Sequence, residues 1–140
     1  MDSKMNTTLV PLVGRILLGL IFVLSGFSKL GNPSGTIAYI AHTGLPMPPL
    51  AYAVSLLVEL GGGLLLVFGL LTRWVALALA LFCLVTAFAV HGFADQNNMI
   101  HAMKNISMAG GFIYVAGYGA GLWSLDALLS RRRGLSVQHA

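Results

Sequence analysis

Residues 74–92 read WVALALALFCLVTAFAVHG, and this stretch decides the class of protein. No Asp, Glu, Lys or Arg occurs between Arg73 and Asp95. A hydrocarbon core of about 30 Å takes about 20 apolar residues to cross as a helix. Backbone groups in lipid must find their hydrogen bonds within the segment itself, which favours a helix. The stretch is therefore predicted to be a transmembrane helix.

Three further segments on either side of this stretch carry the same prediction, at about residues 9–30, 50–71 and 103–125. The longest connection runs from Gly31 to Pro49, and residues 36–42 within it are predicted to form a short helix at the membrane interface. The predicted fold class is an all-α membrane protein. It is a single domain over residues 1–140, a four-transmembrane-helix up-down bundle with one short interfacial helix between helices one and two.

The composition excludes several other classes. Hydrophobic residues make up 57% of the chain and charged residues 9%, and the mean hydropathy is +0.86. A soluble domain carries about 25% charged residues, so a soluble enzyme is excluded. The net charge is +4, but the basic residues are scattered apart from Arg131–Arg133, so no nucleic acid is expected as a partner. The expected partner is the lipid bilayer.

The distribution of Lys and Arg predicts the orientation. With four spans, both termini and the connection between the second and third spans lie on the same side of the membrane. That side carries Lys4, Arg15, Arg73, Arg131, Arg132 and Arg133, whereas the other carries Lys29 and Lys104. Both termini are therefore predicted to be cytoplasmic. Because Arg15 interrupts the first apolar run, we expect this helix to be retained and not cleaved as a signal peptide.

Polar residues share a face with small residues on every predicted span, at alternating spacings of three and four. The faces are Arg15, Gly19, Phe22, Gly26 and Lys29; Tyr52, Ser55, Glu59, Gly62, Leu66 and Gly69; Ala76, Ala80, Leu84, Ala87 and His91; and His101, Lys104, Ser107, Gly111, Tyr114, Tyr118 and Gly121. Small residues let helices approach closely in lipid, and polar groups avoid lipid. These faces are predicted to converge inside the bundle.

Glu59 is the most deeply placed charge and needs a partner in the membrane. Arg15 is the favoured partner in a buried polar centre, and Lys104 is the alternative. Such a pair can simply fix which helices face each other. The functional interpretation is that Glu59 belongs to a pocket that opens outward. Its candidate residues lie near the outer helix ends: Lys29, His91, His101, Lys104 and Asn105.

The histidines and the cysteine predict no metal or disulfide chemistry. The histidines near the outer face are expected to form interfacial hydrogen bonds and to hold neither haem nor a metal ion. Cys83 is the single cysteine, so an intramolecular disulfide and a Cys-x-x-Cys redox pair are both excluded. The chain is therefore not expected to carry out redox chemistry by itself.

Several motifs together resemble the DoxX family of small bacterial inner-membrane proteins. They are RILLG (15–19), GFSKL (26–30), ELGGG (59–63), GLLTR (69–73), His91 and KNISMAGG (104–111). The resemblance implies a four-helix bundle in the bacterial inner membrane. Some relatives are subunits of a thiosulfate:quinone oxidoreductase, and others act with soluble redox enzymes under oxidative or thiol stress. The family pattern marks Arg15, Lys29, Glu59, Arg73, His91, Lys104 and Asn105.

The leading functional interpretation is a redox-associated membrane subunit that acts with a soluble or membrane redox protein. Its ligand would be a quinone or a thiol oxidant, in thiol- or sulfur-linked electron transfer or an oxidative-stress response. A quinone would take hydrogen bonds from Lys104, Asn105 and His91, with Glu59 carrying protons. One alternative is a non-enzymatic scaffold or anchor subunit of a complex. Another is a small transporter, which would need to oligomerise because four helices form a thin wall. The glycine-rich faces permit a homo-oligomer.

Overall fold

The structure is a computed structural model that describes residues 3–137, with the side chains of residues 8–134. It is helical throughout, and no strand occurs within residues 3–137. The elements are α1 (Ser3–Gly31), α2 (Pro33–His42), α3 (Pro48–Leu56), the π-helix η1 (Leu57–Gly61), α4 (Gly62–Phe68), α5 (Thr72–Thr86), the π-helix η2 (Ala87–His91), α6 (Gln96–Tyr118) and α7 (Leu125–Val137). The predicted all-α fold class and the short helix after the first span are thus confirmed.

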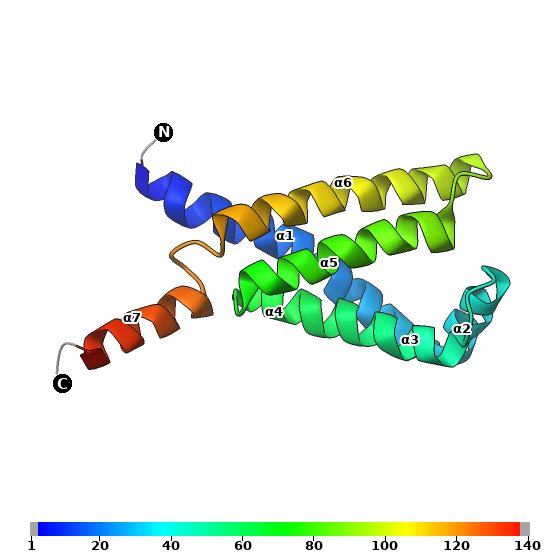
Figure 1. The fold of residues 1–140 in the computed structure, drawn as a ribbon, viewed down its shortest axis with the longest axis horizontal. Helices are drawn as coiled ribbons and strands as arrows, with labels where there is room; N and C mark the ends of the chain where they lie inside the picture. The colour runs from blue at the N-terminus through cyan, green and yellow to red at the C-terminus, as the bar shows by residue number, and fades with distance from the viewer. Residues whose placement is uncertain (1–2, 138–140) are drawn as a thin grey trace.

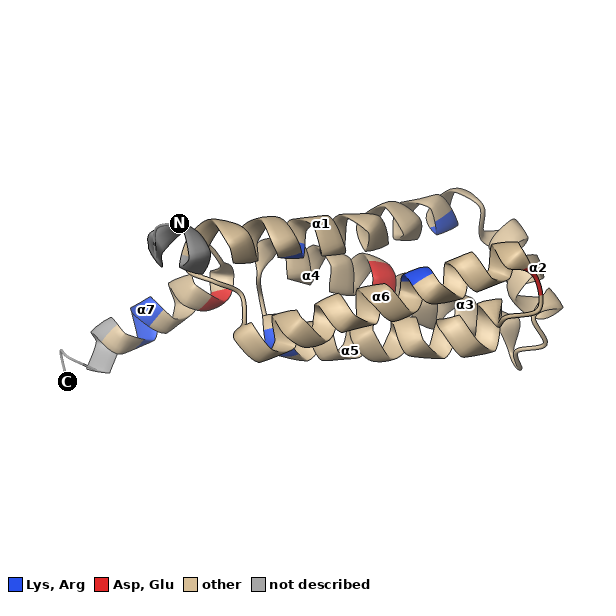
Figure 2. Cartoon of the chain, turned by 90° about the horizontal axis from the view of Figure 1, so that it is seen from above, with Lys and Arg blue, Asp and Glu red and all other residues tan. Residues whose placement is uncertain are grey.

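The chain passes along the bundle four times, as α1, α3–η1–α4, α5–η2 and α6 (Figure 1). One end carries α2 and the η2–α6 connection, and is called the α2 end. The opposite end carries the α4–α5 turn and α7, and is called the α7 end. Figures 1 and 2 show that α1 begins and α7 finishes at this same end, with α7 projecting beyond the bundle.

Three segments are long and apolar enough to cross a membrane: Thr8–Gly31, Pro48–Phe68 and Thr72–His91. They coincide with the first three predicted spans to within a few residues. The fourth pass, α6, is 23 residues long but carries more polar side chains, among them His101, Lys104 and Asn105. Length and composition alone therefore mark three spans within the described part of the chain.

The prediction for the fourth span placed its ends wrongly. It began at about residue 103, whereas α6 begins at Gln96. Asp95 caps the helix by accepting a 2.9 Å hydrogen bond from the amide of Asn98, so a polar stretch that resembles a loop forms the first helical turns. The helix ends at Tyr118 because Gly119 follows with φ +85°, a conformation that favours glycine.

The core lies between the four passes. Phe22, Leu66, Leu79 and Phe112 are almost fully buried there, and the rings of Phe22 and Phe112 meet edge to face at 5.3 Å. The close approach of α1 to η1 and α4 depends on glycine residues in α1. A Cβ at Gly19 would lie 3.0 Å from the carbonyl oxygen of Gly63, and a Cβ at Gly26 would lie 2.9 Å from the Cβ of Leu60. These two contacts set the antiparallel register of α1 against η1–α4.

The predicted face of the last span is also corrected. α6 buries Ala102, Asn105, Ala109 and Phe112, mostly against α5. Tyr114 and Tyr118, predicted to lie inside, are 64% and 74% exposed. Their rings stack on each other at 4.3 Å on the outer surface of the helix. Small side chains on the opposite face let α6 pack closely on α5, and this packing turns the tyrosines outward.

Candidate functional site

A cavity of about 600 Å³ opens between the helices at the α2 end. Side chains of α1, α2, α3, η1, α5, η2 and α6 line it, so every pass of the bundle contributes. Six of the seven predicted site residues lie in its wall. They are Lys29, Glu59, His91, His101, Lys104 and Asn105. The structure thus brings together residues that span positions 29 to 105 of the chain.

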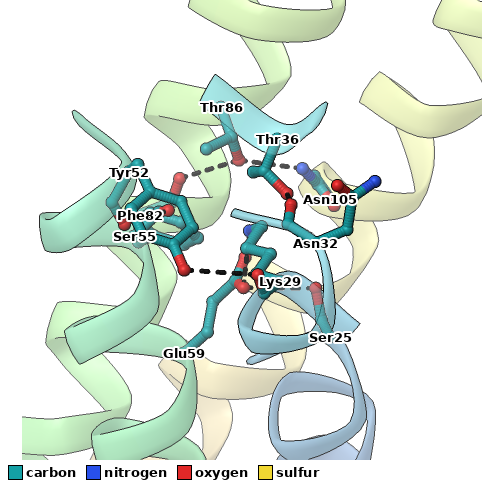
Figure 3. Close-up of polar contacts among 10 residues, drawn as sticks. All are labelled: Ser25, Lys29, Asn32, Thr36, Tyr52, Ser55, Glu59, Phe82, Thr86 and Asn105. Atoms are coloured by element: carbon teal, nitrogen blue, oxygen red, sulfur yellow. Dashed lines mark hydrogen bonds and ion pairs between the residues drawn. The ribbon is translucent and has the colours of Figure 1, made fainter. Parts of the chain in front are cut away.

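Glu59 lies on η1 and is 6% exposed. The ammonium of Lys29 lies 2.5 Å from Glu59 Oε2, and the hydroxyl of Ser25 donates a 3.1 Å hydrogen bond to the same oxygen (Figure 3). Both partners come from α1, one helical turn apart. The buried carboxylate is therefore neutralised by the neighbouring helix, as a charge in lipid requires.

The partner of Glu59 is neither Arg15 nor Lys104, and both predicted pairings are corrected. The glycine contacts place Gly26 opposite Leu60 and Gly19 opposite Val67. In this register Glu59 faces the last turns of α1, where Ser25 and Lys29 lie. Arg15 is 14 positions earlier than Lys29, which is about 21 Å along a helix that rises 1.5 Å per residue. The side chain of Arg15 cannot bridge that distance.

Arg15 instead acts at the α7 end, where it is 3% exposed. Its guanidinium donates to the carbonyl oxygens of Val67 at 3.3 Å, of Ala120 at 2.6 Å and of Trp123. Val67 lies in the last turn of α4, whose carbonyl groups attract positive charge. Arg15 is therefore a structural link outside the cavity, and the predicted Arg15–Glu59 centre is split between the two ends of the bundle.

Asn105 is 8% exposed and connects α6 to α5. Its amide nitrogen donates a 2.8 Å hydrogen bond to Thr86 Oγ1 (Figure 3). The Thr86 hydroxyl lies 2.9 Å from the carbonyl oxygen of Phe82, to which it donates. This chain of two bonds fixes the amide plane of Asn105 in the cavity wall.

His91 and His101 stack on each other across the η2–α6 corner, with ring centroids 5.2 Å apart and an interplanar angle of 24°. Lys104 Nζ lies 3.5 Å from His101 Nδ1. The Nδ1 atom of His91 is buried and has no hydrogen-bond partner among the described residues. Buried polar atoms are nearly always paired, so this atom is an exception among the described side chains.

Both π-helical segments carry site residues. Glu59 lies on η1, and His91 is the last residue of η2. A π-helical turn inserts one extra residue into the helix, and this changes the direction in which the neighbouring side chains point. Such turns are frequent at functional sites. Two neighbouring passes therefore share the same local distortion, and both distortions lie at the cavity.

Three contributors to the site were missed by the sequence analysis. Ser25 lies four residues before Lys29 on the same helix, a spacing that places both side chains on one face. Thr86 precedes His91 by five residues and orients Asn105. Tyr52 was placed on the polar face, but its role in donating to the carbonyl oxygen of Lys29 at 3.2 Å was not foreseen. The four-residue spacing was a usable signal only for Ser25.

No group of three or more His, Cys, Asp or Glu side chains within the described part of the chain is placed to hold a metal ion. The cavity wall contains two histidines, one carboxylate and Cys83, which is 1% exposed. Most polar groups of the cavity wall are hydrogen-bond donors, and the rest of the wall is apolar. This arrangement suits an organic ligand with a polar head.

Fold and site together define a helical integral membrane protein with a cavity between its helices, whose wall combines a few charged and polar groups with a larger apolar surface. The chain belongs to the DoxX family, whose model matches residues 10–92, from α1 to the residue after η2. The predicted family is thus confirmed. The α6 residues of the site, His101, Lys104 and Asn105, lie beyond that match.

Two Escherichia coli (strain K12) proteins are similar over most of their length. Inner membrane protein YqjF is 42% identical over 124 residues, covering 86% of this chain and 92% of YqjF. Inner membrane protein YphA is 38% identical, covering 82% of this chain and 86% of YphA. A Bacillus subtilis (strain 168) protein named "Putative oxidoreductase CatD" is 42% identical over 48% of each chain. No solved structure matches this chain.

Proposed function

We propose that this chain is a redox-associated subunit of the bacterial inner membrane whose cavity binds a quinone and which works with a redox protein partner. The observation that carries the proposal is the Lys29–Glu59 pair in the cavity wall. Both hydrogen bonds to the carboxylate reach Oε2, so Oε1 is left to a ligand. The name of CatD and those of the two E. coli relatives support the redox role and the membrane.

The polar groups fit the two ends of a quinone ring. Lys104 and the second amide hydrogen of Asn105 are donors for ring carbonyl oxygens, and Glu59 is placed to exchange a proton with the ring. A bound quinone would accept two electrons and two protons. The chain has no electron-carrying motif of its own, so the electrons come from the partner. Its residues bind the ring, orient it and supply protons.

The proposal includes α6 as a fourth span. Its 23 residues give a length of about 34 Å at 1.5 Å per residue, enough for a core of about 30 Å. Asn105 bonds to α5, and His101 and Lys104 line the cavity, so these polar groups avoid lipid. Four spans place both termini on the side of Arg73 and Arg131–Arg133, which is the cytoplasmic side by the excess of basic residues.

Mass spectrometry of protein released gently from native membranes tests the proposal. We expect a bound quinone-sized mass on the parent chain and its loss from a Glu59→Gln variant. Lys104→Gln, at an exposed position, should weaken the same complex without affecting the fold, and Arg131→Gln on α7 is the matched control. Thermal unfolding of each variant separates loss of ligand from loss of fold. A chain free of any small molecule would overturn the quinone site and favour the scaffold alternative.

A further inference from the structure

Three basic side chains lie together in the wall of the cavity, and they are called the basic cluster: His91, His101 and Lys104. They come from η2 and α6, which pack against each other. The two rings stack at 5.2 Å, and the Lys104 ammonium lies 3.5 Å from His101 Nδ1. With neutral histidines, Lys104 carries the charge of this cluster, and a charge beside a largely apolar cavity is stabilised by a counter-charge from the protein or from a ligand.

The protein supplies no counter-charge to the basic cluster within the described residues. The cavity wall carries two lysines and one carboxylate, and that carboxylate is bound by Lys29 and Ser25 on the opposite wall. Asp95 lies near in the chain, but both its oxygens are bound by Asn98 and it is not a lining residue. With neutral histidines, the cavity therefore has a formal charge of +1, from two lysines and one glutamate.

Much of the remaining wall is apolar. Ile21 of α1, Leu50 and Val54 of α3, and Val85 of α5 also line the cavity. A volume of about 600 Å³ lies in the range that holds one drug-sized ligand. A two-chain phospholipid exceeds that size. The wall thus fits a single-tailed molecule.

We infer that the cavity selects an amphiphilic anion, a molecule with one apolar tail and an ionised oxygen on its head that binds the basic cluster. The inference rests on the proposed function in taking this cavity as the ligand site, and it adds the charge state of the ligand. The ammonium of Lys104 and a ring N–H of His91, which lines the cavity, donate to the ionised oxygen. A quinone of this class carries an ionised ring hydroxyl group.

Three probes of matched shape or charge test the inference at neutral pH in a neutral detergent. The first is a hydroxy-alkyl-naphthoquinone, whose ring hydroxyl group is ionised, and the second is its uncharged methoxy counterpart. The third is dodecanoate, an anion with no quinone ring. Binding is measured as the ligand-induced rise in unfolding temperature and by titration calorimetry, on the parent chain and on Lys104→Gln, His91→Gln, Glu59→Gln and Arg131→Gln.

We expect the hydroxy compound to bind at least about tenfold more tightly than the methoxy compound, because a charge-assisted hydrogen bond is about twice as strong as a neutral one. Lys104→Gln and His91→Gln should each remove this preference, and Arg131→Gln should keep it. Dodecanoate should raise the unfolding temperature in a Lys104-dependent way.

The outcomes separate this inference from the proposed function. Equal binding of the hydroxy and methoxy compounds, lost in Glu59→Gln, would overturn the inference and leave the quinone site standing. Lys104-dependent binding of dodecanoate with no binding of either naphthoquinone would support anion selection and overturn the quinone site. Dodecanoate binding that is unchanged by Lys104→Gln would overturn the inference.

Discussion

Arg15 donates a 2.6 Å hydrogen bond to the carbonyl oxygen of Ala120, 105 positions later in the chain. The same guanidinium bonds to Val67 at the end of α4 and to Trp123 before α7. It therefore joins the first pass, the second pass and the segment that follows the fourth. Arg15 holds the α7 end together, while the Lys29–Glu59 pair lies near the α2 end.

Replacing Arg15 by Met should lower the free energy of unfolding by about 3 kcal/mol, because buried carbonyl oxygens would lose charged donors. Arg15→Lys should restore part of the loss, since a lysine can reach one of the three oxygens. Unfolding in mixed detergent micelles measures both. Arg131→Met, at an exposed site, should stay within about 0.5 kcal/mol of the parent. A loss of equal size in the Arg131 variant would contradict the structural role of Arg15.

Replacing Lys29 by Met should destabilise the protein by about 2 kcal/mol, because Glu59 remains buried without its counter-charge. The double variant Lys29→Met, Glu59→Leu removes both charges and should recover most of that loss. A double-mutant cycle measured by unfolding gives the coupling, expected at about 1 to 2 kcal/mol. Additive effects would show that the two residues do not form a pair.

Protonation of Asp126 at acid pH should lower the stability of the fold. Its carboxylate accepts the amides of Leu71 at 2.8 Å and Thr72 at 2.9 Å, at the start of α5. Burial acts to raise the pKa of Asp126, but the hydrogen bonds from Thr72 and Leu71 and the charge of Arg15 together outweigh it. The pKa is therefore held below its ordinary value of 3.8.

A lowered folded-state pKa means that the stabilisation is present above pH 3.8 and is lost as the pH falls through the folded-state pKa. Asp126→Asn should lower stability by about 1 kcal/mol at neutral pH, as for loss of a helix cap. The difference between parent and variant should shrink below pH 3.8, measured by unfolding across a pH series. A difference that is constant with pH would exclude a role for the charge.

Gly26→Ala should destabilise the protein by about 1 to 3 kcal/mol, because the new Cβ would lie 2.9 Å from Leu60 Cβ and 3.2 Å from its Cα. Gly110→Ala is the matched control on another helix, since a Cβ there meets nothing within 4 Å. It should be neutral or stabilising, because alanine favours a helix more than glycine does. Similar losses in both variants would argue against the close α1–η1 contact.

Most of the helices, and six of the seven candidate residues that line the cavity, could be predicted from the sequence. Uninterrupted apolar runs predict where helices lie, because length and hydropathy are local properties. Polar residues in those runs avoid lipid, so the sequence alone could place Lys29, Glu59 and Asn105 together. Their function stays a prediction, because it depends on a ligand that the residue pattern does not name.

The partner of Glu59 and the face of α6 were not predictable in the same way. Both depend on the register between helices, and the register is set by contacts such as Gly26 with Leu60 that no single segment reveals. Tyr114 was assigned to the interior because its spacing matched the polar face. Packing of α6 on α5 selected a different face, around Ala109 and Phe112.

The π-helical turn at 57–61 has a consequence for how this protein can diversify. One extra residue rotates everything before it by about 100° relative to everything after it. The α3 half, which lines the cavity, and the α4 half, which packs in the core, are therefore out of rotational phase. Substitutions in the first half can change the lining of the cavity while the second half keeps its packing. A one-residue deletion within the turn would restore a regular helix and turn Glu59 away from Lys29.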